Sequence, residues 1–336
     1  MVATERNGKK TLFGQYGKLS VKNGHLVGED GSYVQLKGVS THNMNSFPEF
    51  VNDDAIEFMA DNWGMQLFRL AMYSAFADGD DGYSDGSDAH REELENIIIR
   101  SVKKCAELGI YVMVDWHILF DYDPNMHKDM ALKFFEKMVP VLSEYDNVIY
   151  EICNEPSMDV DWAVFKPEWQ KLRETWPEKK CSWDSIKAYA NEVIPVIRKA
   201  KPDCVIVCGT TMWSQGVDEA ADSPLEFENM LYALHFYATT HKQSLRDKAI
   251  YALKKGIGIY VTEYGICDAA GSGDVDFVET ARWIDFINEN KLCYTVWNLS
   301  NKNETSAMIK PDCKKLTGWT EDELSVSGKW FVGLNK

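Results

Sequence analysis

Short apolar runs recur along most of the chain, and amphipathic segments lie between them. The runs have the length of strands and are rich in β-branched residues, whereas the segments between them repeat apolar positions every three or four residues, which is typical of helices. Eight runs are predicted strands: 34–40, 65–73, 111–117, 147–156, 204–210, 231–237, 258–265 and 292–300. Helical segments between them are 91–109, 130–145, 185–200, 244–256 and 275–290.

Strands that alternate with helices predict a parallel sheet. Eight such units predict an α/β fold, the closed (β/α)8 TIM barrel, which usually takes about 250 residues before insertions. Ahead of the barrel, residues 19–36 alternate in hydropathy and contain Asn-Gly and Asp-Gly turn signals, so we expect a short N-terminal β-hairpin there. No fixed-period repeat or low-complexity linker divides the chain, so residues 1–336 are predicted to form a single domain.

The segment 157–182 is a predicted insertion after the fourth strand. It carries Trp162, Trp169 and Trp176, and a spacing of seven is what one face of a helix repeats. Two interpretations remain open. The tryptophans anchor the insertion onto the barrel, or they wall a cleft on its functional face, because loops after barrel strands lie on that face.

Composition and charge narrow the class of protein. With 45% hydrophobic and 26% charged residues, the chain has the balance of an ordinary globular protein. A net charge of −16 argues against nucleic acid as a partner, because phosphate binding requires a basic surface. No apolar run reaches the roughly 18 residues of a membrane helix. The first ten residues lack the apolar segment of a signal peptide, so the protein is intracellular or its leader has been removed.

The eight cysteines show no metal-binding pattern. None forms a Cys-x-x-Cys pair, and the spacing of Cys204 and Cys208 is wrong for a zinc knuckle. Most lie in apolar runs, so we expect buried, reduced thiols that act as small hydrophobic side chains.

Polar and aromatic residues gather where the predicted strands end, which is where (β/α)8 barrels build their active sites. A side-chain period of two places Glu263 on the same face as Val261 and Ile259. By the same rule Glu155 shares a face with Glu151, which we interpret as structural and paired inside the barrel. The candidates are Arg69, Asp115, Trp116, His117, Asn154, Glu155, Trp213, His235, Tyr237, Glu263 and Trp297.

Two glutamates at matching positions, Glu155 and Glu263, indicate glycoside hydrolysis. A strand-end glutamate alone is more often a solvated residue or a helix cap, but two that face one cleft provide the acid and the second carboxylate that this reaction needs. Tryptophans provide flat apolar platforms for sugar rings. The alternative is a metallohydrolase that uses His117 and His235, but such enzymes expect a His-x-His pair, which is absent among the seven histidines.

The motifs YEICNEP and VTEYG, with FRLAMY, DWH, LHFYA and VWNLSNKNETSA between and around them, resemble glycoside hydrolase family 5. The bacterial endo-β-1,4-glucanases of that family, the cellulases, resemble the chain most. The resemblance extends from about residue 15 to the C-terminal SGKWFVGLN. It implies a retaining mechanism with Glu155 as general acid/base and Glu263 as nucleophile, without a metal or other cofactor.

The resemblance also implies roles for the residues around this pair. Asn154 binds the sugar 2-hydroxyl, Arg69 and Tyr237 keep the nucleophile ionised, and His235 supports the acid/base. The remaining sugar contacts that it implies are His117, Trp297, Trp213, Lys302, Glu304, His42 and Tyr73.

The main prediction is a secreted or cell-surface, monomeric endoglucanase that acts on β-glucan polysaccharides or oligosaccharides. Three alternatives to it remain. A β-mannanase or a mixed-linkage glucanase would use the same residues. A non-catalytic carbohydrate-binding protein would have lost Glu155 or Glu263, and both are present. A metal-dependent barrel hydrolase would lose activity in a chelator.

Overall fold

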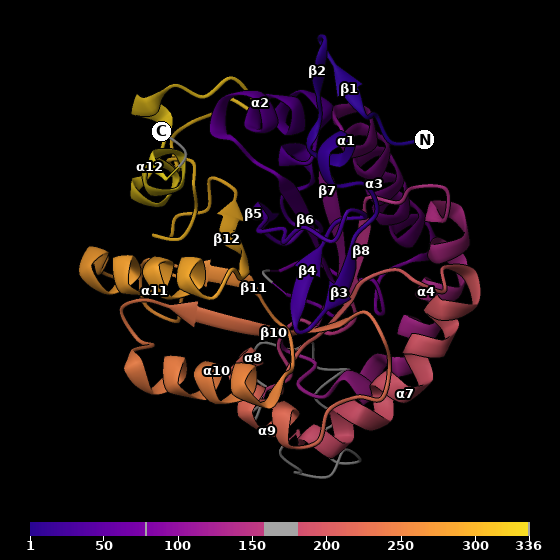
Figure 1. The fold of residues 1–336 in the computed structure, drawn as a ribbon. Coiled ribbons are helices and arrows are strands. Elements are labelled where there is room, and N and C mark those ends of the chain that lie inside the picture. The colour runs from indigo at the N-terminus through magenta and orange to yellow at the C-terminus, as the bar shows by residue number, and fades with distance from the viewer. Residues whose placement is uncertain (78, 158–180, 335–336) are drawn as a thin grey trace.

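A computed structural model describes residues 1–77, 79–157 and 181–334. Eight parallel strands form a closed barrel in which β12 pairs with β5, and Figure 1 shows helices surrounding it. The (β/α)8 prediction is therefore confirmed. The barrel strands are β5 Lys37–Thr41, β6 Leu67–Tyr73, β7 Tyr111–His117, β8 Val148–Glu151, β9 Ile206–Cys208, β10 Met230–Tyr237, β11 Ile259–Gly265 and β12 Cys293–Leu299.

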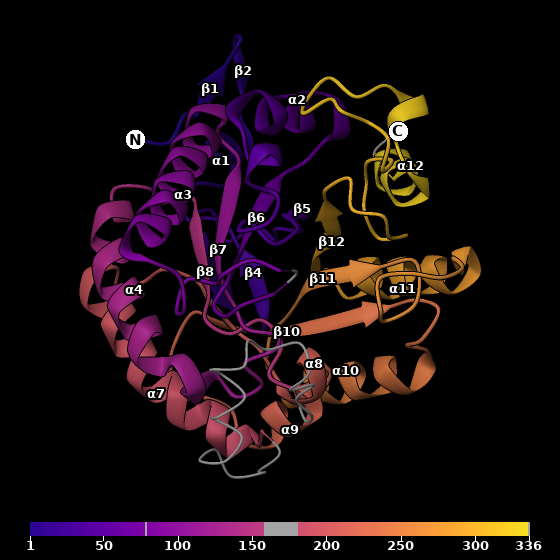
Figure 2. The ribbon, with the colours of Figure 1, turned by 180° about the vertical axis from the view of Figure 1, so that it is seen from behind.

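Helices cover the outside of the barrel, as the two opposite views in Figures 1 and 2 show. Side-chain caps start several of them: Asn52, Ser87 and Ser182 each accept a hydrogen bond from a first-turn backbone N–H. The helices are α1 Leu12–Tyr16, α2 Asp53–Trp63, α3 Asp88–Leu108, α4 Lys128–Leu142, α7 Trp183–Ala200, α8 Thr211–Ser214, α9 Val217–Asp222, α10 Gln243–Lys255, α11 Phe277–Glu289 and α12 Val326–Gly333. Short 3-10 helices are η1 Pro48–Phe50, η2 Pro124–His127 and η4 Glu321–Glu323.

The predicted N-terminal hairpin is present. Strands β3 (Ser20–Lys22) and β4 (His25–Val27) pair antiparallel, and Asn23 and Gly24 between them both have positive φ, as the tight hairpin turn requires. A second small hairpin, β1 (Glu5–Arg6) with β2 (Lys9–Lys10), was not predicted.

The N-terminal hairpin closes one end of the barrel. Leu19, Leu26 and Leu36 form one buried apolar cluster with Leu67 and Tyr111, which lie in the first half of their strands. This packing fills the interior at the end where the strands begin, so the opposite end is left for polar side chains.

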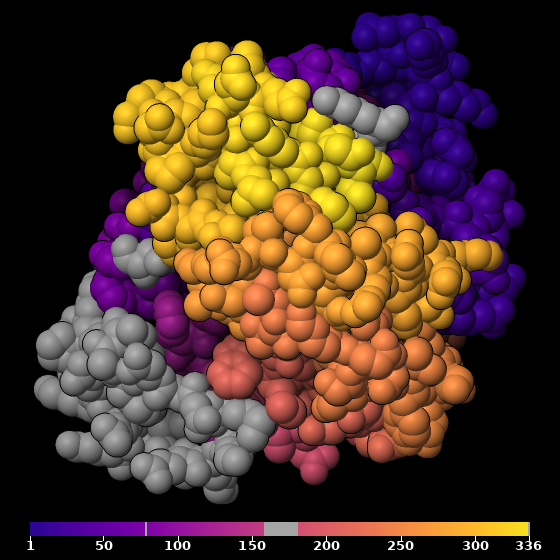
Figure 3. Space-filling view, turned by 90° about the vertical axis from the view of Figure 1, so that its left-hand side faces the viewer, coloured from indigo at the N-terminus to yellow at the C-terminus, as the bar shows by residue number. Residues whose placement is uncertain are grey.

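The C-terminal segment packs on the outside of the barrel. Trp319 lies against Trp63 of α2, with ring centroids 5.3 Å apart, and also stacks on Phe50. In the space-filling view of Figure 3, the C-terminal residues in yellow lie directly beside the orange residues of the α11 region.

The fourth strand is shorter than predicted. We expected 147–156, but β8 ends at Glu151. Glu155 therefore lies beyond the strand, and the notion that it shares a strand face with Glu151 is wrong. The insertion 157–182 lies almost entirely outside the described residues. Trp183, which follows it, is buried and donates a hydrogen bond to the Ser223 carbonyl (2.8 Å), so this tryptophan anchors α7.

All eight cysteines are buried and none is in a disulfide, as the apolar context of most of them indicates. Among the described helices, none combines the length and apolar character needed to cross a bilayer.

Candidate active site

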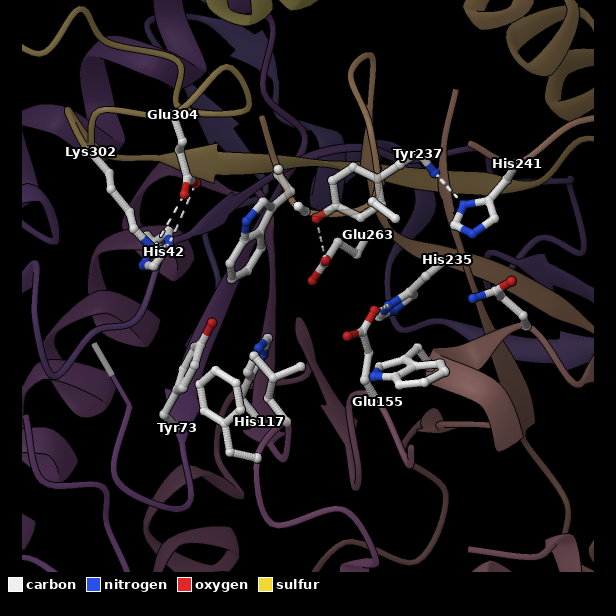
Figure 4. Close-up of a pocket in the computed structure, with 18 residues that line it drawn as sticks. His42, Tyr73, His117, Glu155, His235, Tyr237, His241, Glu263, Lys302 and Glu304 are labelled. Atoms are coloured by element: carbon white, nitrogen blue, oxygen red, sulfur yellow. Dashed lines mark hydrogen bonds and ion pairs between the residues drawn. The ribbon is translucent and has the colours of Figure 1, made fainter. Parts of the chain in front are cut away.

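A cavity of about 590 Å³ opens at the C-terminal ends of the barrel strands (Figure 4). Eleven of the thirteen residues to which the family resemblance assigns a role line it: His42, Tyr73, His117, Glu155, Trp213, His235, Tyr237, Glu263, Trp297, Lys302 and Glu304. The other two, Arg69 and Asn154, are fully buried beneath it. Of the two further strand-end candidates, Asp115 lies beside Arg69 inside the barrel, whereas Trp116 packs in the outer core and is not part of the site. Lining residues that the sequence did not indicate are Leu119, Phe120, Gln215, His241, Ala269, Ala270 and Gly271.

The two glutamates lie close together. One oxygen of Glu155, one oxygen of Glu263 and a ring nitrogen of His235 all lie within 4.8 Å of one another. Glycosidases that form a covalent intermediate place their carboxyl groups about 5–5.5 Å apart, whereas those that activate water directly need roughly 6.5–9.5 Å. The spacing here corresponds to the first type.

Glu155 is held by the segment that follows β8. Its backbone N–H donates to the Ile118 carbonyl, and its carboxyl group is hydrogen-bonded to His235 Nδ1 at 2.8 Å. Burial raises the pKa of Glu155 to about 8, because a carboxylate loses hydration in this site; the Arg69 guanidinium acts in the opposite direction. Glu155 is therefore protonated near neutral pH.

Glu263 accepts two hydrogen bonds, from the Tyr237 hydroxyl (2.7 Å) and from Arg69 Nη1 (3.2 Å). We expected Arg69 to lower the pKa of Glu263. Burial outweighs this effect and, with the charge of Glu155, raises the pKa of Glu263 to about 7. Glu155 keeps the higher pKa of the two, because Glu263 accepts hydrogen bonds from both Arg69 and Tyr237.

Arg69 connects the polar groups beneath the cavity. It lies at the third position of β6 rather than at its end, and it is completely buried. Its guanidinium donates to Glu151 (2.7 Å), Asn154 (2.6 Å) and Glu263, and it lies 3.0 Å from the Asp115 carboxylate. Glu151 is thus paired inside the barrel, as predicted. A buried guanidinium with this many acceptors fixes them relative to one another.

A β-bulge in β11 changes which residues face the barrel interior. Ala233 of β10 pairs with Tyr260, and His235 pairs with Glu263, so β11 has one residue more than β10 over this stretch. The pairing with β12 shows the same extra residue. As a result Thr262 and Glu263 both contact interior groups, although they are consecutive.

The bulge overturns the expected face of Glu263. Val261 and Ile259 pack in the outer core between the sheet and its helices, not beside Glu263. Strict alternation would have turned Glu263 outwards with them. The extra residue brings its carboxylate into the cavity instead.

Trp213 reaches the cavity from an unusual turn. Met212, Trp213 and Ser214 have φ angles of 57°, 56° and 56°, a left-handed conformation that L-residues disfavour. The turn is tied to the Glu155 segment: the Trp213 N–H donates to the Pro156 carbonyl (2.9 Å), and the Ser214 hydroxyl donates to the Asn154 carbonyl (2.6 Å). These two bonds fix the Trp213 side chain relative to the segment that carries Glu155.

The far end of the cavity carries a second polar group (Figure 4). Lys302 Nζ lies 3.2 Å from His42 Nε2 and 3.2 Å from the Glu304 carboxylate. Between this group and the two glutamates, the His117 ring stacks on Tyr73 at 4.1 Å and on Trp297 at 5.4 Å. Flat rings flanked by polar groups suit a chain of sugar units.

Among the described residues, one group of three could hold a metal ion: Glu155, His235 and Glu263. The Arg69 guanidinium beside Glu263 disfavours a cation there, because its positive charge repels one. Proton transfer between the carboxyl groups and a substrate is the chemistry that this arrangement favours.

A (β/α)8 barrel with two buried, hydrogen-bonded carboxyl groups at its C-terminal end defines a glycosidase-type hydrolase. The comparisons with known proteins agree. The chain belongs to glycosyl hydrolase family 5, because the cellulase model of that family matches residues 27–303.

Relatives and solved structures extend this finding. An endoglucanase of Clostridium saccharobutylicum is 41% identical over 318 residues, which are 95% of this chain and 64% of that protein. Endoglucanase N of Pectobacterium atrosepticum is 42% identical over 315 residues, 94% of this chain and 64% of its own length. The chain thus spans slightly less than two thirds of these relatives. The crystal structure of the catalytic domain of Thermobifida fusca endoglucanase Cel5A is 33% identical, with a TM-score of 0.83, and covers 96% of this chain and 99% of that chain.

Proposed function

We propose that this chain is a retaining endo-β-1,4-glucanase that hydrolyses internal bonds of cellulose and related β-glucans. The observation that carries the proposal is the pair Glu155 and Glu263, within 4.8 Å at the floor of an aromatic cavity. The relatives of this chain support a β-glucan as the substrate, since they are named endoglucanases and the structure of a variant of the Thermobifida fusca domain was solved with cellotetraose. An insoluble polymer implies action outside the cell or at its surface.

In the first step, Glu263 attacks the anomeric carbon and Glu155 protonates the leaving oxygen. The bond between sugar and leaving group breaks, and an ester between the sugar and Glu263 forms. Tyr237 and Arg69 hold the attacking carboxylate in place through the bonds described above.

In the second step, Glu155 acts as the base. It removes a proton from water, which attacks the anomeric carbon, and Glu263 leaves as a carboxylate. Asn154, fixed by Arg69, lies beside this pair, where it suits the sugar 2-hydroxyl. The far group of His42, Lys302 and Glu304 binds sugars on the non-reducing side, and Trp213 binds on the leaving-group side.

The test is hydrolysis of carboxymethyl-cellulose, lichenan and mannan side by side, each with and without a chelator. We expect release of reducing ends from the two glucans, little from mannan, and no effect of the chelator. Proton NMR of the first product should show the β-anomer. An α-anomer would contradict retention, faster mannan cleavage would contradict the glucan preference, and loss of activity in chelator would indicate a metallohydrolase.

The pH dependence of kcat/KM should be bell-shaped. Activity rises as Glu263 ionises near pH 7 and falls as Glu155 loses its proton near pH 8, so the maximum lies between these values. Initial rates on a soluble cello-oligosaccharide at constant ionic strength measure this. A maximum below pH 5 would show that burial does not set these pKa values.

A further inference from the structure

A chain of hydrogen bonds extends from Glu155 into the barrel. Glu155 Oε1 lies 2.8 Å from His235 Nδ1, His235 Nε2 lies 2.8 Å from Thr262 Oγ1, and the Thr262 hydroxyl donates to Glu151 Oε1 at 2.7 Å. All four side chains are buried. Thr262 faces inwards by the normal alternation from Tyr260, and the bulge in β11 brings Glu263 in beside it.

The number of available hydrogens fixes the direction of each bond. A threonine hydroxyl has one hydrogen. Burial raises the pKa of Glu151, but the ion pair with Arg69 at 2.7 Å holds it as a carboxylate, so Thr262 gives its hydrogen to the other Glu151 oxygen. Thr262 can therefore only accept from His235, so Nε2 must carry a hydrogen. Burial lowers the pKa of His235 to about 4, which leaves the ring neutral and Nδ1 without a hydrogen. Nδ1 is then an acceptor, and the hydrogen of its bond to Glu155 belongs to the carboxyl group.

We propose that Thr262 and Glu151 are positioning residues that hold His235 in its Nε2–H tautomer and thereby keep the proton on Glu155. The proposal rests on the acid/base role of Glu155 in the proposed function. It concerns two residues that touch no substrate and act through the histidine.

The fixed tautomer serves both steps of the reaction. Before the first step, the protonated Glu155 is stabilised by its bond to Nδ1. Once the proton has passed to the leaving group, the Glu155 carboxylate faces a nitrogen lone pair and has no donor from His235, so it takes a proton from water more readily. The other tautomer would donate to the carboxylate and stabilise it, so less of Glu155 would be protonated near neutral pH before the first step, and its carboxylate would be a weaker base in the second.

Other charged groups also act on this pair, from the neighbouring strands. In the described part of the chain the titratable groups among them are Arg69 on β6, Asp115 on β7, Glu151 on β8, the neutral Tyr237 on β10, His241 after β10 and Glu263 on β11. A change at Thr262 replaces none of these groups and removes only the hydroxyl between His235 and Glu151, which makes this residue the one to vary.

The first test compares Thr262→Val with Thr262→Ser. Valine has nearly the shape of threonine but no hydroxyl, so His235 is free to adopt the other tautomer and donate to Glu155. We expect the upper limb of the kcat/KM profile to move down by about one pH unit in Thr262→Val and to stay in place in Thr262→Ser. Thr295→Val, which removes an equally buried hydroxyl from β12, is the matched control and should leave the limb unchanged. If the upper limb of the kcat/KM profile of Thr262→Val stays at the wild-type pH, the proposal is overturned.

The second test needs no variant of Thr262 and no substrate. Nitrogen-15 NMR of the resting protein, with the His235 signals assigned by their absence in His235→Gln, distinguishes the two neutral tautomers. We expect a hydrogen on Nε2 and none on Nδ1 at pH 7. A hydrogen on Nδ1, alone or together with Nε2, would refute the proposal even if Thr262→Val does not fold. If the protein cleaves no β-glucan, the proposed function fails, while this spectrum still decides the tautomer.

Discussion

Glu263→Gln is expected to lower kcat on every β-glucan and aryl glycoside by on the order of 10⁶-fold, the scale seen when an enzyme loses its nucleophile. The amide cannot attack the anomeric carbon, so no glycosyl-enzyme ester forms. Glutamine keeps the size of the side chain, so the bond from Tyr237 can persist and the fold should be retained. Glu226→Gln, at an exposed glutamate, is the control and should retain full activity.

Chemical rescue makes this test specific. In Glu263→Gly, azide can enter the space of the lost carboxylate and attack an activated aryl glycoside. The expected product is the α-glycosyl azide, because one displacement inverts the configuration. Formation of the β-azide would assign Glu263 to the acid/base position instead.

Glu155→Gln is expected to separate substrates by their leaving groups. On cello-oligosaccharides kcat/KM should fall by about 10²- to 10⁴-fold, the usual contribution of general acid catalysis. An aryl glycoside with a good leaving group needs little protonation, so its first step should proceed almost normally. The second step still lacks a base, so the glycosyl-enzyme accumulates and an initial burst of the phenol appears.

Stopped-flow release of the phenol measures the burst, and its amplitude should match the enzyme concentration. In Glu155→Ala, azide should accelerate the second step and yield the β-azide, with retained configuration. Equal losses of activity on natural and activated substrates, without a burst, would contradict the role proposed for Glu155.

The sequence predicted the barrel and most of the cavity because both depend on regular patterns. Eight apolar runs with helices between them allow few other folds, and strand ends meet at one end of a barrel. The positions of Glu155 and Glu263 followed from the motifs around them. The face of Glu263 did not, because a bulge depends on how neighbouring strands pair, and this is invisible in one strand's own residues.

The charges beneath the cavity were also only partly predictable. Arg69 was expected beside the nucleophile. Its simultaneous contacts with Asp115 of β7, Glu151 of β8 and Asn154 just after β8 join positions that are distant in sequence. The pKa of Glu263 was misjudged for the same reason. A single partner could be inferred from a motif, whereas the loss of hydration depends on everything that surrounds the group.

The left-handed turn at Met212, Trp213 and Ser214 limits how this rim of the cleft can vary. Each L-residue in that conformation costs roughly 1–2 kcal/mol, and β-branched residues and proline fit it worst. A library that randomises these three positions and is selected for stability alone should therefore be enriched in glycine, asparagine and aspartate, whereas selection for activity should retain Trp213. A D-amino acid, introduced by chemical synthesis, would favour this backbone. Trp213 therefore occupies a position whose φ angle the L-configuration disfavours.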